Sequence, residues 1–340
     1  MSKKKLRVVV ATMKDEGPYI LEWLAYHHVI GFDHFIVFSN DCWDTTAEIL
    51  QTVSDELGIV SYFENSGLHG LEQGENKDPQ RRAYERAIRN RHAQSADYVL
   101  VLDADEFLNI HAGAGTLHDL LAAAPKFEAM SFTWKLFGSS HVTEIKDDLV
   151  ISQFTKCLTV DRSTLARKMG VKTLFHPRRV QKFGVHRPFY DAAIKEGHSS
   201  IRWLNGSGED VFDYYRDLAW HATDESHGCA LAEINHYAVK SVGAFLIKMR
   251  RGSANSHKGD RISLEYLQYY NHNETADTSI QRHEVAVKNV LQGWLQRSPK
   301  LAALHADAIE IHRKVAEDMT QILLMEDPRY LKEFGLQREN

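Results

Sequence analysis

Short apolar runs alternate with segments of helical periodicity along the first hundred residues. The runs at 6–12, 32–38 and 59–63 are rich in Val, Ile and Phe and have the length of strands. Between them, 19–30 and 46–57 carry apolar residues at helical spacing. Strands and helices that alternate in this way predict an α/β fold, a mostly parallel, Rossmann-like sheet flanked by helices.

Local signals support these helix limits. Pro18 suits the first turn of the first helix, and Gly31 suits its end. Thr45 and Glu48 form a capping-box pattern at the start of the second helix. A basic helix is expected over 80–94, packed beneath the strand that follows it.

That following strand ends in carboxylates. The apolar run 99–102 leads directly into Asp103, Asp105 and Glu106. On extended backbone Asp103 and Asp105 point the same way, and Glu106 points elsewhere. Two converging carboxylates favour a hard cation such as Mg²⁺ or Mn²⁺. The alternative is a solvated strand end followed by a turn.

The pattern of the sequence changes near residue 252, from alternating strands and helices to long helical segments. We expect an α/β domain over 1–252 and a helical appendage over 253–340, where 279–324 shows long helical periodicity. Its apolar stripe must pack on something. The first expectation is the α/β domain, and the alternatives are a second copy of the chain or a peripheral membrane contact.

Composition narrows the class of protein. The 340 residues are 43% hydrophobic, and their formal net charge is −5, which argues against a broad basic surface for nucleic acid. Three scattered cysteines predict neither a disulfide frame nor a thiolate zinc site. The apolar run at 8–11 is too short for a signal sequence. We therefore expect a cytoplasmic protein, with peripheral attachment at the inner face of a membrane as the alternative.

Several motifs, in order, carry a resemblance to a known family. They are Lys14 to His27, which contains E-W-L-x-Y-H, Gly31 to Phe35, Asp44-x-Thr46, Asp103 to Leu108, Trp134 to Ser140, Lys172-Thr173, Gly184 to Pro188 and His236 to Ser241. Together they resemble the family-two-like glycosyltransferases with a GT-A fold, in the subgroup that has an E-W-L-x-Y-H first helix. The resemblance covers residues 6–252.

The resemblance implies an enzyme of glycan or polysaccharide biosynthesis. It would move a sugar, expected from a UDP-sugar, to a hydroxyl of a glycan, lipid-linked or protein acceptor, with inversion. Asp103 and Asp105 would be the D-x-D pair that binds Mn²⁺ or Mg²⁺. A third metal ligand would be His236 or His186. The alternative to metal binding, for each histidine, is an ordinary position on the surface or in the core.

The resemblance also implies the donor contacts. These are Lys14, Asp15, Glu16, Asn40, Asp44, Asp103 and Lys240. The family's second loop reads D-D-x-S-x-D, and here only Asp44 matches clearly, which leaves the contact of Asn40 in doubt. Asp44 can equally be a helix-capping residue.

The acceptor side and the catalytic base complete the expected site. Trp134 and Phe137 fall where the resemblance places acceptor contacts, since aromatic faces stack on sugar rings, although Trp134 can also be core. A carboxylate must take the acceptor's proton, and Asp210 and Asp191 are the nominated bases. The glycine-rich surroundings of Asp210 fit a plain exposed loop better than a catalytic position.

Two other functions share parts of this pattern. A sugar-nucleotide nucleotidyltransferase would carry a glycine-rich phosphate loop after its first strand, whereas 13–18 holds a single glycine. A non-catalytic sugar- or nucleotide-binding module would need no metal. Intact Asp103 and Asp105 argue against such a module.

Overall fold

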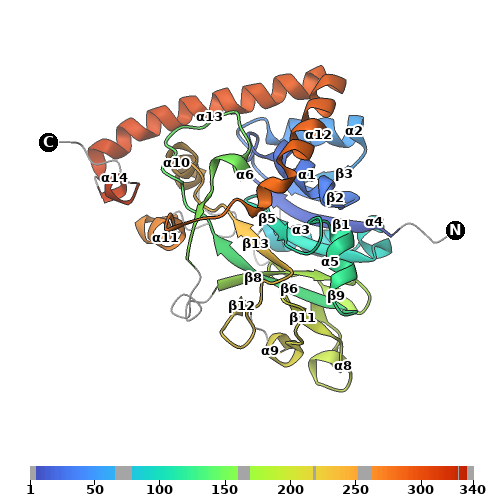
Figure 1. Ribbon diagram of the computed structural model, residues 1–340. Coiled ribbons are helices and arrows are strands. Elements are labelled where there is room, and N and C mark those ends of the chain that lie inside the picture. The colour runs from blue at the N-terminus through green and yellow to red at the C-terminus, as the bar shows by residue number, and fades with distance from the viewer. Residues whose placement is uncertain are drawn as a thin grey trace, which may run out of the picture.

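The computed structural model describes residues 5–65, 79–159, 169–216, 220–251, 262–327 and 329–334. The described strands form one large sheet of ten strands in the order β3-β2-β1-β4-β8-β6-β13-β5, with β11 and β12 beside β6 and β8 (Figure 1). Its strands are β1 (Arg7–Met13), β2 (His34–Ser39), β3 (Val60–Glu64), β4 (Tyr98–Asp103), β5 (Glu106–Ile110), β6 (Ala129–Leu136), β8 (Met169–Phe175), β11 (Trp203–Asn205), β12 (His221–Ala222) and β13 (Ala232–His236).

Smaller elements complete the chain. Two short pairs join β9 (Val180–Lys182) to β10 (Phe189–Tyr190) and β7 (Lys156–Cys157) to β14 (Thr275–Ala276). The helices are α1 (Ile20–Val29), α2 (Thr46–Leu57), α3 (Pro79–Ala87), α4 (Arg91–Ser95), α5 (Leu117–Ala123), α6 (Val150–Gln153), α8 (Ala192–Lys195), α9 (Phe212–Arg216), α10 (Val242–Arg251), α11 (Leu264–Tyr270), η1 (Ser279–His283), α12 (Glu284–Arg297), α13 (Pro299–Glu326) and α14 (Arg329–Glu333).

Strand directions make the sheet mixed but mostly parallel. Strands β3, β2, β1 and β4 are parallel to one another. Strand β8 runs antiparallel between β4 and β6, and β5 runs antiparallel beside β13. The predicted α/β class with flanking helices is confirmed, and the arrangement is consistent with a GT-A-like fold.

Both faces of the sheet are covered, which explains the continuous apolar runs in its central strands. Along β1, Val9 and Ala11 pack into the core that contains α1 and α2, whereas Val8 and Val10 pack against α3 and α4. Alternate residues of one strand therefore enter two different cores.

Two local predictions need correction. Thr45 does not cap α2 through its side chain; its hydroxyl donates to the Leu304 carbonyl (2.9 Å) on α13. The expected helix 80–94 is two helices, because Asn90 has extended backbone and its side chain accepts the His92 N–H to cap α4.

The E-W-L-x-Y-H helix binds the strand that follows the carboxylates. Trp23 Nε1 donates to the Glu106 carbonyl (2.9 Å), and the Tyr26 hydroxyl donates to the Leu108 carbonyl (2.8 Å). His27 donates from Nδ1 to the Trp23 carbonyl (2.8 Å) and accepts the Leu108 N–H (3.4 Å) at Nε2. These residues thus fix the position of β5 relative to α1.

His27 gives the fold a specific pH dependence. Burial lowers the pKa of His27 from 6.5 to about 3. Between pH 6.5 and about pH 3, His27 is therefore protonated in the unfolded chain but neutral in the native state. The free energy of unfolding consequently falls as the pH drops below 6.5. At pH 5 this loss amounts to about 2 kcal/mol. We expect His27→Gln to reduce the difference in unfolding free energy between pH 7.5 and pH 5 by that amount in urea titrations; an unchanged difference would contradict the assignment.

The C-terminal helices pack on the α/β part of the chain. Helix α12 lies against α1, and α13 runs along α2 and α10 (Figure 1). The predicted boundary at 252 lies outside the described residues, so the division into 1–252 and 253–340 stays a prediction. None of the described helices combines the length and apolar character that a membrane crossing requires.

Candidate active site

The carboxylates lie on a tight connection between two strands. Asp103 ends β4, Ala104 and Asp105 form a turn, and Glu106 begins β5. The turn corrects the prediction that Asp103 and Asp105 share an extended strand. Strand β13 lies beside this turn, where the Tyr237 N–H donates to the Asp105 carbonyl (2.8 Å).

Asp103 and Glu106 share one buried cation. Lys172 Nζ, on β8, lies 2.8 Å from Asp103 Oδ2 and 3.1 Å from Glu106 Oε2. The Asp103 N–H also donates to Glu106 Oε2 (2.8 Å), and Gln80 donates to Asp103 Oδ1 (3.0 Å). Glu106 therefore points into the site, which corrects the expectation that it points elsewhere.

The charges in this cluster are balanced by neighbouring side chains rather than by solvent. Burial opposes the charge on Lys172, yet the carboxylates of Asp103 and Glu106 hold the pKa of its ammonium above the ordinary value. Burial raises the pKa of Glu106, with Lys172 opposing that shift. The network stays paired only while all of its members are present.

Asp105 belongs to a second cluster. Its Oδ2 accepts from Lys248 Nζ on α10 (2.8 Å), and its Oδ1 lies 3.5 Å from His236 Nε2 at the end of β13. Burial alone would raise the pKa of Asp105, but Lys248 and His236 hold it well below the ordinary value. Asp105 is therefore an ionised carboxylate in a buried setting.

The first loop joins the same surroundings. Glu16 pairs with Lys240 (3.4 Å) and with Arg251 (2.7 Å), and Arg251 also donates to the Lys14 carbonyl. Lys240 Nζ lies 4.3 Å from the centre of the Tyr19 ring. Burial opposes ionisation of Glu16, but the two cations lower its pKa. Helix α10 thus places Lys248 against Asp105 and Arg251 against Glu16.

Asp44 connects the first two loops to α13. It accepts hydrogen bonds from the Gly17 N–H (3.0 Å), the Thr46 N–H (3.0 Å) and His312 Nε2 (2.7 Å). Both of its oxygens are engaged by the protein. The nominated Asn40 is buried beside this loop, and its carbonyl accepts from the Cys42 thiol (3.7 Å).

Asp15, Cys42 and Asp44 form the one group of three possible metal ligands that the described residues bring within 4.8 Å of one another. Burial raises the pKa of Asp15 to about 6 and that of the Cys42 thiol to about 12. A cation bound here would have to replace hydrogen bonds that Asp44 accepts from Gly17, Thr46 and His312.

Asp105 and His236 fit a divalent cation better. Neighbouring ligands of an octahedral ion with bonds of about 2.1 Å lie about 3 Å apart, close to the 3.5 Å between Asp105 Oδ1 and His236 Nε2. Two protein ligands suffice where substrate phosphates and water complete the shell. Of the two nominated histidines, His236 lies against Asp105. His186 instead donates from Nδ1 to the Val171 carbonyl (3.0 Å).

The two nominated acceptor aromatics have different positions. Trp134 is 8% exposed and lies between His236 and His186, with ring centroids 4.4 and 5.6 Å away. Phe137 is fully buried against Tyr237, so its predicted contact with an acceptor finds no exposed ring in this structure. Trp134 therefore borders the site, and Phe137 belongs to the core.

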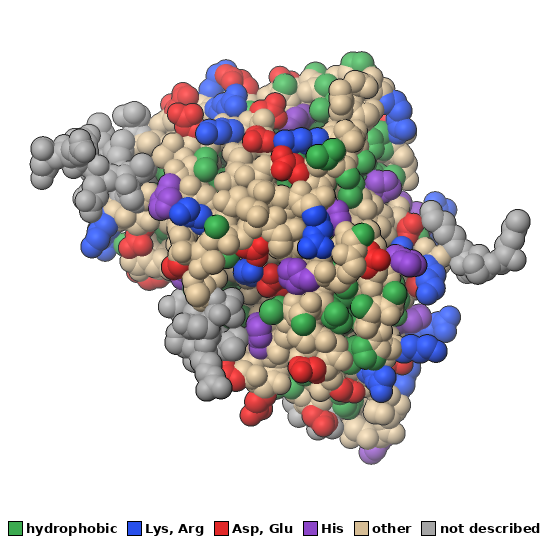
Figure 2. All heavy atoms as spheres, in the orientation of Figure 1, with side chains coloured by type: hydrophobic (Ala, Val, Ile, Leu, Met, Phe, Trp, Pro, Cys, Tyr) green, Lys and Arg blue, Asp and Glu red, His purple; other side chains and the backbone are tan. Residues whose placement is uncertain are grey.

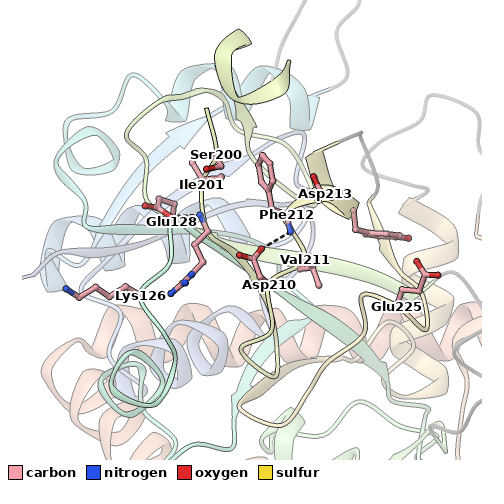
Figure 3. Close-up of a pocket in the computed structure, with 11 residues that line it drawn as sticks. Lys126, Glu128, Ser200, Ile201, Asp210, Val211, Phe212, Asp213 and Glu225 are labelled. Atoms are coloured by element: carbon pink, nitrogen blue, oxygen red, sulfur yellow. Dashed lines mark hydrogen bonds between the residues drawn. The ribbon is translucent and has the colours of Figure 1, made fainter. Parts of the chain in front are cut away.

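The nominated bases lie toward the opposite ends of the strands from Asp103. Strand β11, which precedes Asp210, pairs Trp203 with the first residue of β6, whereas His236 pairs with its last. Asp210 accepts the Phe212 N–H (3.1 Å) and lines a separate pocket of about 910 Å³ (Figure 3). Asp191 caps α8 and pairs with Arg179 (2.9 Å). The structure does not bring either acid to Asp103, and their role as bases stays a prediction.

Sequence reasoning gave no role to Lys172 and did not nominate Gln80 or His312. Lys172 left a usable signal, since a lysine in the middle of the apolar run 169–175 must have a buried partner. Gln80 and His312 left none, because their contacts come from distant helices.

A comparison with known families places the chain. The sequence pattern of the family described as glycosyltransferase family 92 matches residues 4–231. The chain belongs to glycosyltransferase family 92. A family 92 protein of Oryza sativa subsp. japonica is 26% identical over 225 residues, which are 64% of this chain and 34% of that protein. This family 92 member therefore spans about a third of the length of that curated relative. The predicted relationship to glycosyltransferases is confirmed, and the family that matches is family 92.

Solved structures resemble the family 92 chain only distantly. A mannosyltransferase, PcManGT from Pyrobaculum calidifontis, solved with GDP-Man and Mn²⁺, aligns with a TM-score of 0.35 at 14% identity, covering 98% of this chain and 85% of its own. HddC from Yersinia pseudotuberculosis aligns with a TM-score of 0.30 at 8% identity, covering 58% and 88%. The fold assignment therefore rests on the strand order and directions of this chain.

Proposed function

We propose that this family 92 member moves a sugar from a nucleotide-diphosphate sugar to an acceptor hydroxyl, with a divalent cation bound by Asp105 and His236. One observation carries the proposal: a buried carboxylate 3.5 Å from an imidazole nitrogen, where β4 ends. Ligands of open α/β sheets bind at the carboxyl ends of the strands.

The cations of the site support a diphosphate ligand. Lys240, Lys248 and Arg251 line a small cavity together with Glu16. These cations are held by Glu16 and Asp105, which leaves their charge close to the place where a donor's phosphates would lie. Ammonium and guanidinium groups bind phosphate oxygens through charge-assisted hydrogen bonds.

The acids divide the remaining work. The bound cation would neutralise charge on the diphosphate as it leaves. Asp103, held by Lys172 and Gln80, is positioned to accept a hydrogen bond from a donor hydroxyl. The first loop, with Lys14, Asp15 and Glu16, would contact the nucleoside. UDP-sugars are the donors to test first, from the resemblance of the motifs.

The proposed step is a direct displacement. The acceptor oxygen forms a bond to the anomeric carbon while the bond from that carbon to the diphosphate oxygen breaks. The nucleoside diphosphate leaves with the electron pair, and the hydroxyl proton passes to a base. Attack opposite the leaving group inverts the anomeric configuration, which NMR of the product would report.

Hydrolysis of the donor tests the proposal without knowledge of the acceptor. We expect the wild-type protein to release nucleoside diphosphate slowly from one UDP-sugar of a panel with Mn²⁺ present, and to stop when a chelator is added. The readout is enzyme-coupled detection of the released nucleotide. A panel of uridine, guanosine and thymidine donors with neither hydrolysis nor metal-dependent binding would overturn the proposal. Binding without hydrolysis would indicate a non-catalytic module.

A further inference from the structure

A second pocket opens next to the candidate active site. It has a volume of about 480 Å³, and its lining includes Tyr84, Lys182, Val185, His186 and Trp220. Binding pockets for small ligands typically span about 300–1,000 Å³. The pocket is therefore large enough for one or two sugar rings.

The wall of this pocket contacts the residues that hold Asp103. Lys172 donates to both Asp103 (2.8 Å) and the Val185 carbonyl (3.0 Å). Gln80 donates to both Asp103 (3.0 Å) and the Tyr84 hydroxyl (2.9 Å). A molecule in this pocket would thus lie one layer of side chains from the proposed donor site.

Two aromatic side chains are unusually open here. Trp220 is 45% exposed, and Phe189, which also lines the pocket, is 36% exposed. Trp220 lies against His186, with ring centroids 5.1 Å apart. Because His186 Nδ1 donates to the Val171 carbonyl, its Nε2 is left as a hydrogen-bond acceptor. Aromatic faces beside polar groups are suited to sugar rings.

The charge of the lining is one-sided. Arg81, Lys182 and Arg187 line the pocket, and its described lining contains no carboxylate. Lys182 and Arg187 lie 5.6 and 5.0 Å from the centre of the Phe189 ring. Arg81 pairs with Glu85 (3.7 Å) on the exposed face of α3. A bound anion would find the Lys182 ammonium held over an aromatic ring.

We propose that this pocket is the acceptor subsite and that it takes an anionic saccharide, one that carries a phosphate or a carboxylate group. The inference rests on the proposed function, since it names the acceptor class for that reaction. The sugar ring stacks on Trp220, and the anionic group pairs with Lys182.

The test compares three probes, glucose 6-phosphate, glucuronic acid and glucose, by isothermal titration calorimetry on the full chain. We expect at least one anionic sugar to bind about tenfold more tightly than glucose. Whichever anion binds better distinguishes phosphate from carboxylate. Lys182→Gln is expected to weaken the anionic probes about fivefold and glucose not at all. Trp220→Ala is expected to weaken every probe that binds.

A matched control is Lys300→Gln, which removes the same charge from an exposed position on α13. We expect it to bind all three probes as the wild type does. Equal affinity for glucose and both anions, or an unchanged affinity in Lys182→Gln, would overturn the proposal. Circular dichroism of each variant checks that the fold is intact.

Donor hydrolysis by the wild type, measured without acceptor, separates this inference from the proposed function. Hydrolysis with no binding of any probe would overturn the acceptor inference and leave the transferase. Selective binding of anionic sugars with no hydrolysis of any donor would keep the pocket as an anionic-saccharide site and remove the transferase.

Discussion

Asp105→Asn is expected to lower metal-dependent donor hydrolysis at least about a hundredfold, the scale of removing one group that stabilises charge in a transition state. The amide keeps the shape of the carboxylate but carries no charge for the cation. It also leaves Lys248 without its partner at 2.8 Å. The same experiment on Asp103→Asn should give a similar loss, because Asp103 is the carboxylate that we propose accepts a hydrogen bond from a donor hydroxyl.

The measurement is nucleotide release at saturating Mn²⁺, accompanied by a direct titration of Mn²⁺ binding by electron paramagnetic resonance. We expect Asp105→Asn to lose Mn²⁺ affinity as well as activity. Asp307→Asn, an exposed position on α13, is the control for removal of one carboxylate. An Asp105→Asn protein that hydrolyses donor at the wild-type rate would remove Asp105 from the metal site.

The first half of the fold was predictable because its signals are local. The periodicity over 46–57 gives α2 at the same limits, and the runs at 6–12 and 59–63 give β1 and β3 within one residue. Alternation of strands and helices then gives the order of the sheet around β1. Local signals fail where a side chain has two possible partners, as with Thr45, whose hydroxyl is used by α13.

The pairing within the site was not predictable because it depends on contacts between remote segments. Lys172 is 69 residues from Asp103, and Lys248 is 143 residues from Asp105. No spacing rule links such positions. The carboxylates themselves were visible, since they follow directly on an apolar strand.

Asp210 and Phe137 lie away from Asp103 for different reasons. A short acidic motif such as Glu209-Asp210 carries no information about which edge of the sheet it reaches, and here β11 joins the beginning of β6. An aromatic residue that follows a strand can equally turn inward, as Phe137 does against Tyr237. Only the register of the strands decides between these outcomes.

The surface carries charges of both signs, in agreement with the similar numbers of basic and acidic residues in the sequence. Lys and Arg side chains and Asp and Glu side chains both occupy the face drawn in Figure 2. The cations that matter to the proposed reaction are instead the buried or partly buried ones of β8 and α10, namely Lys172, Lys248 and Arg251. The proposed reaction therefore depends on a few desolvated charges and not on net charge.

Lys172→Met is expected to lower the free energy of unfolding by about 3–5 kcal/mol, the usual cost of breaking a buried ion pair from one side. Lys172 and Glu106 are fully buried, and Asp103 is partly exposed. Removal of the ammonium leaves two carboxylates without a cation, with Gln80 still donating to Asp103 and the Asp103 N–H to Glu106. Urea unfolding at pH 7.5 would measure the loss.

The control compares this pair with an exposed one. Lys288 pairs with Glu284 at the surface of α12, and Lys288→Met is expected to leave the unfolding midpoint unchanged. A Lys172→Met protein as stable as the wild type would show that Glu106 is held neutral and needs no cation. That outcome would also remove Lys172 as the group that fixes Asp103.

The double variant Lys172→Met with Glu106→Gln separates stability from positioning. Glutamine carries no charge, so the double variant should recover part of the stability lost in Lys172→Met. Its amide can still donate one hydrogen bond to Asp103, whereas the ammonium donated to Asp103 and to the Val185 carbonyl together. We therefore expect donor hydrolysis to stay low after stability recovers. Parallel recovery of both would mean that Lys172 acts only through the fold, because a positioning role requires activity to depend on where Asp103 is held.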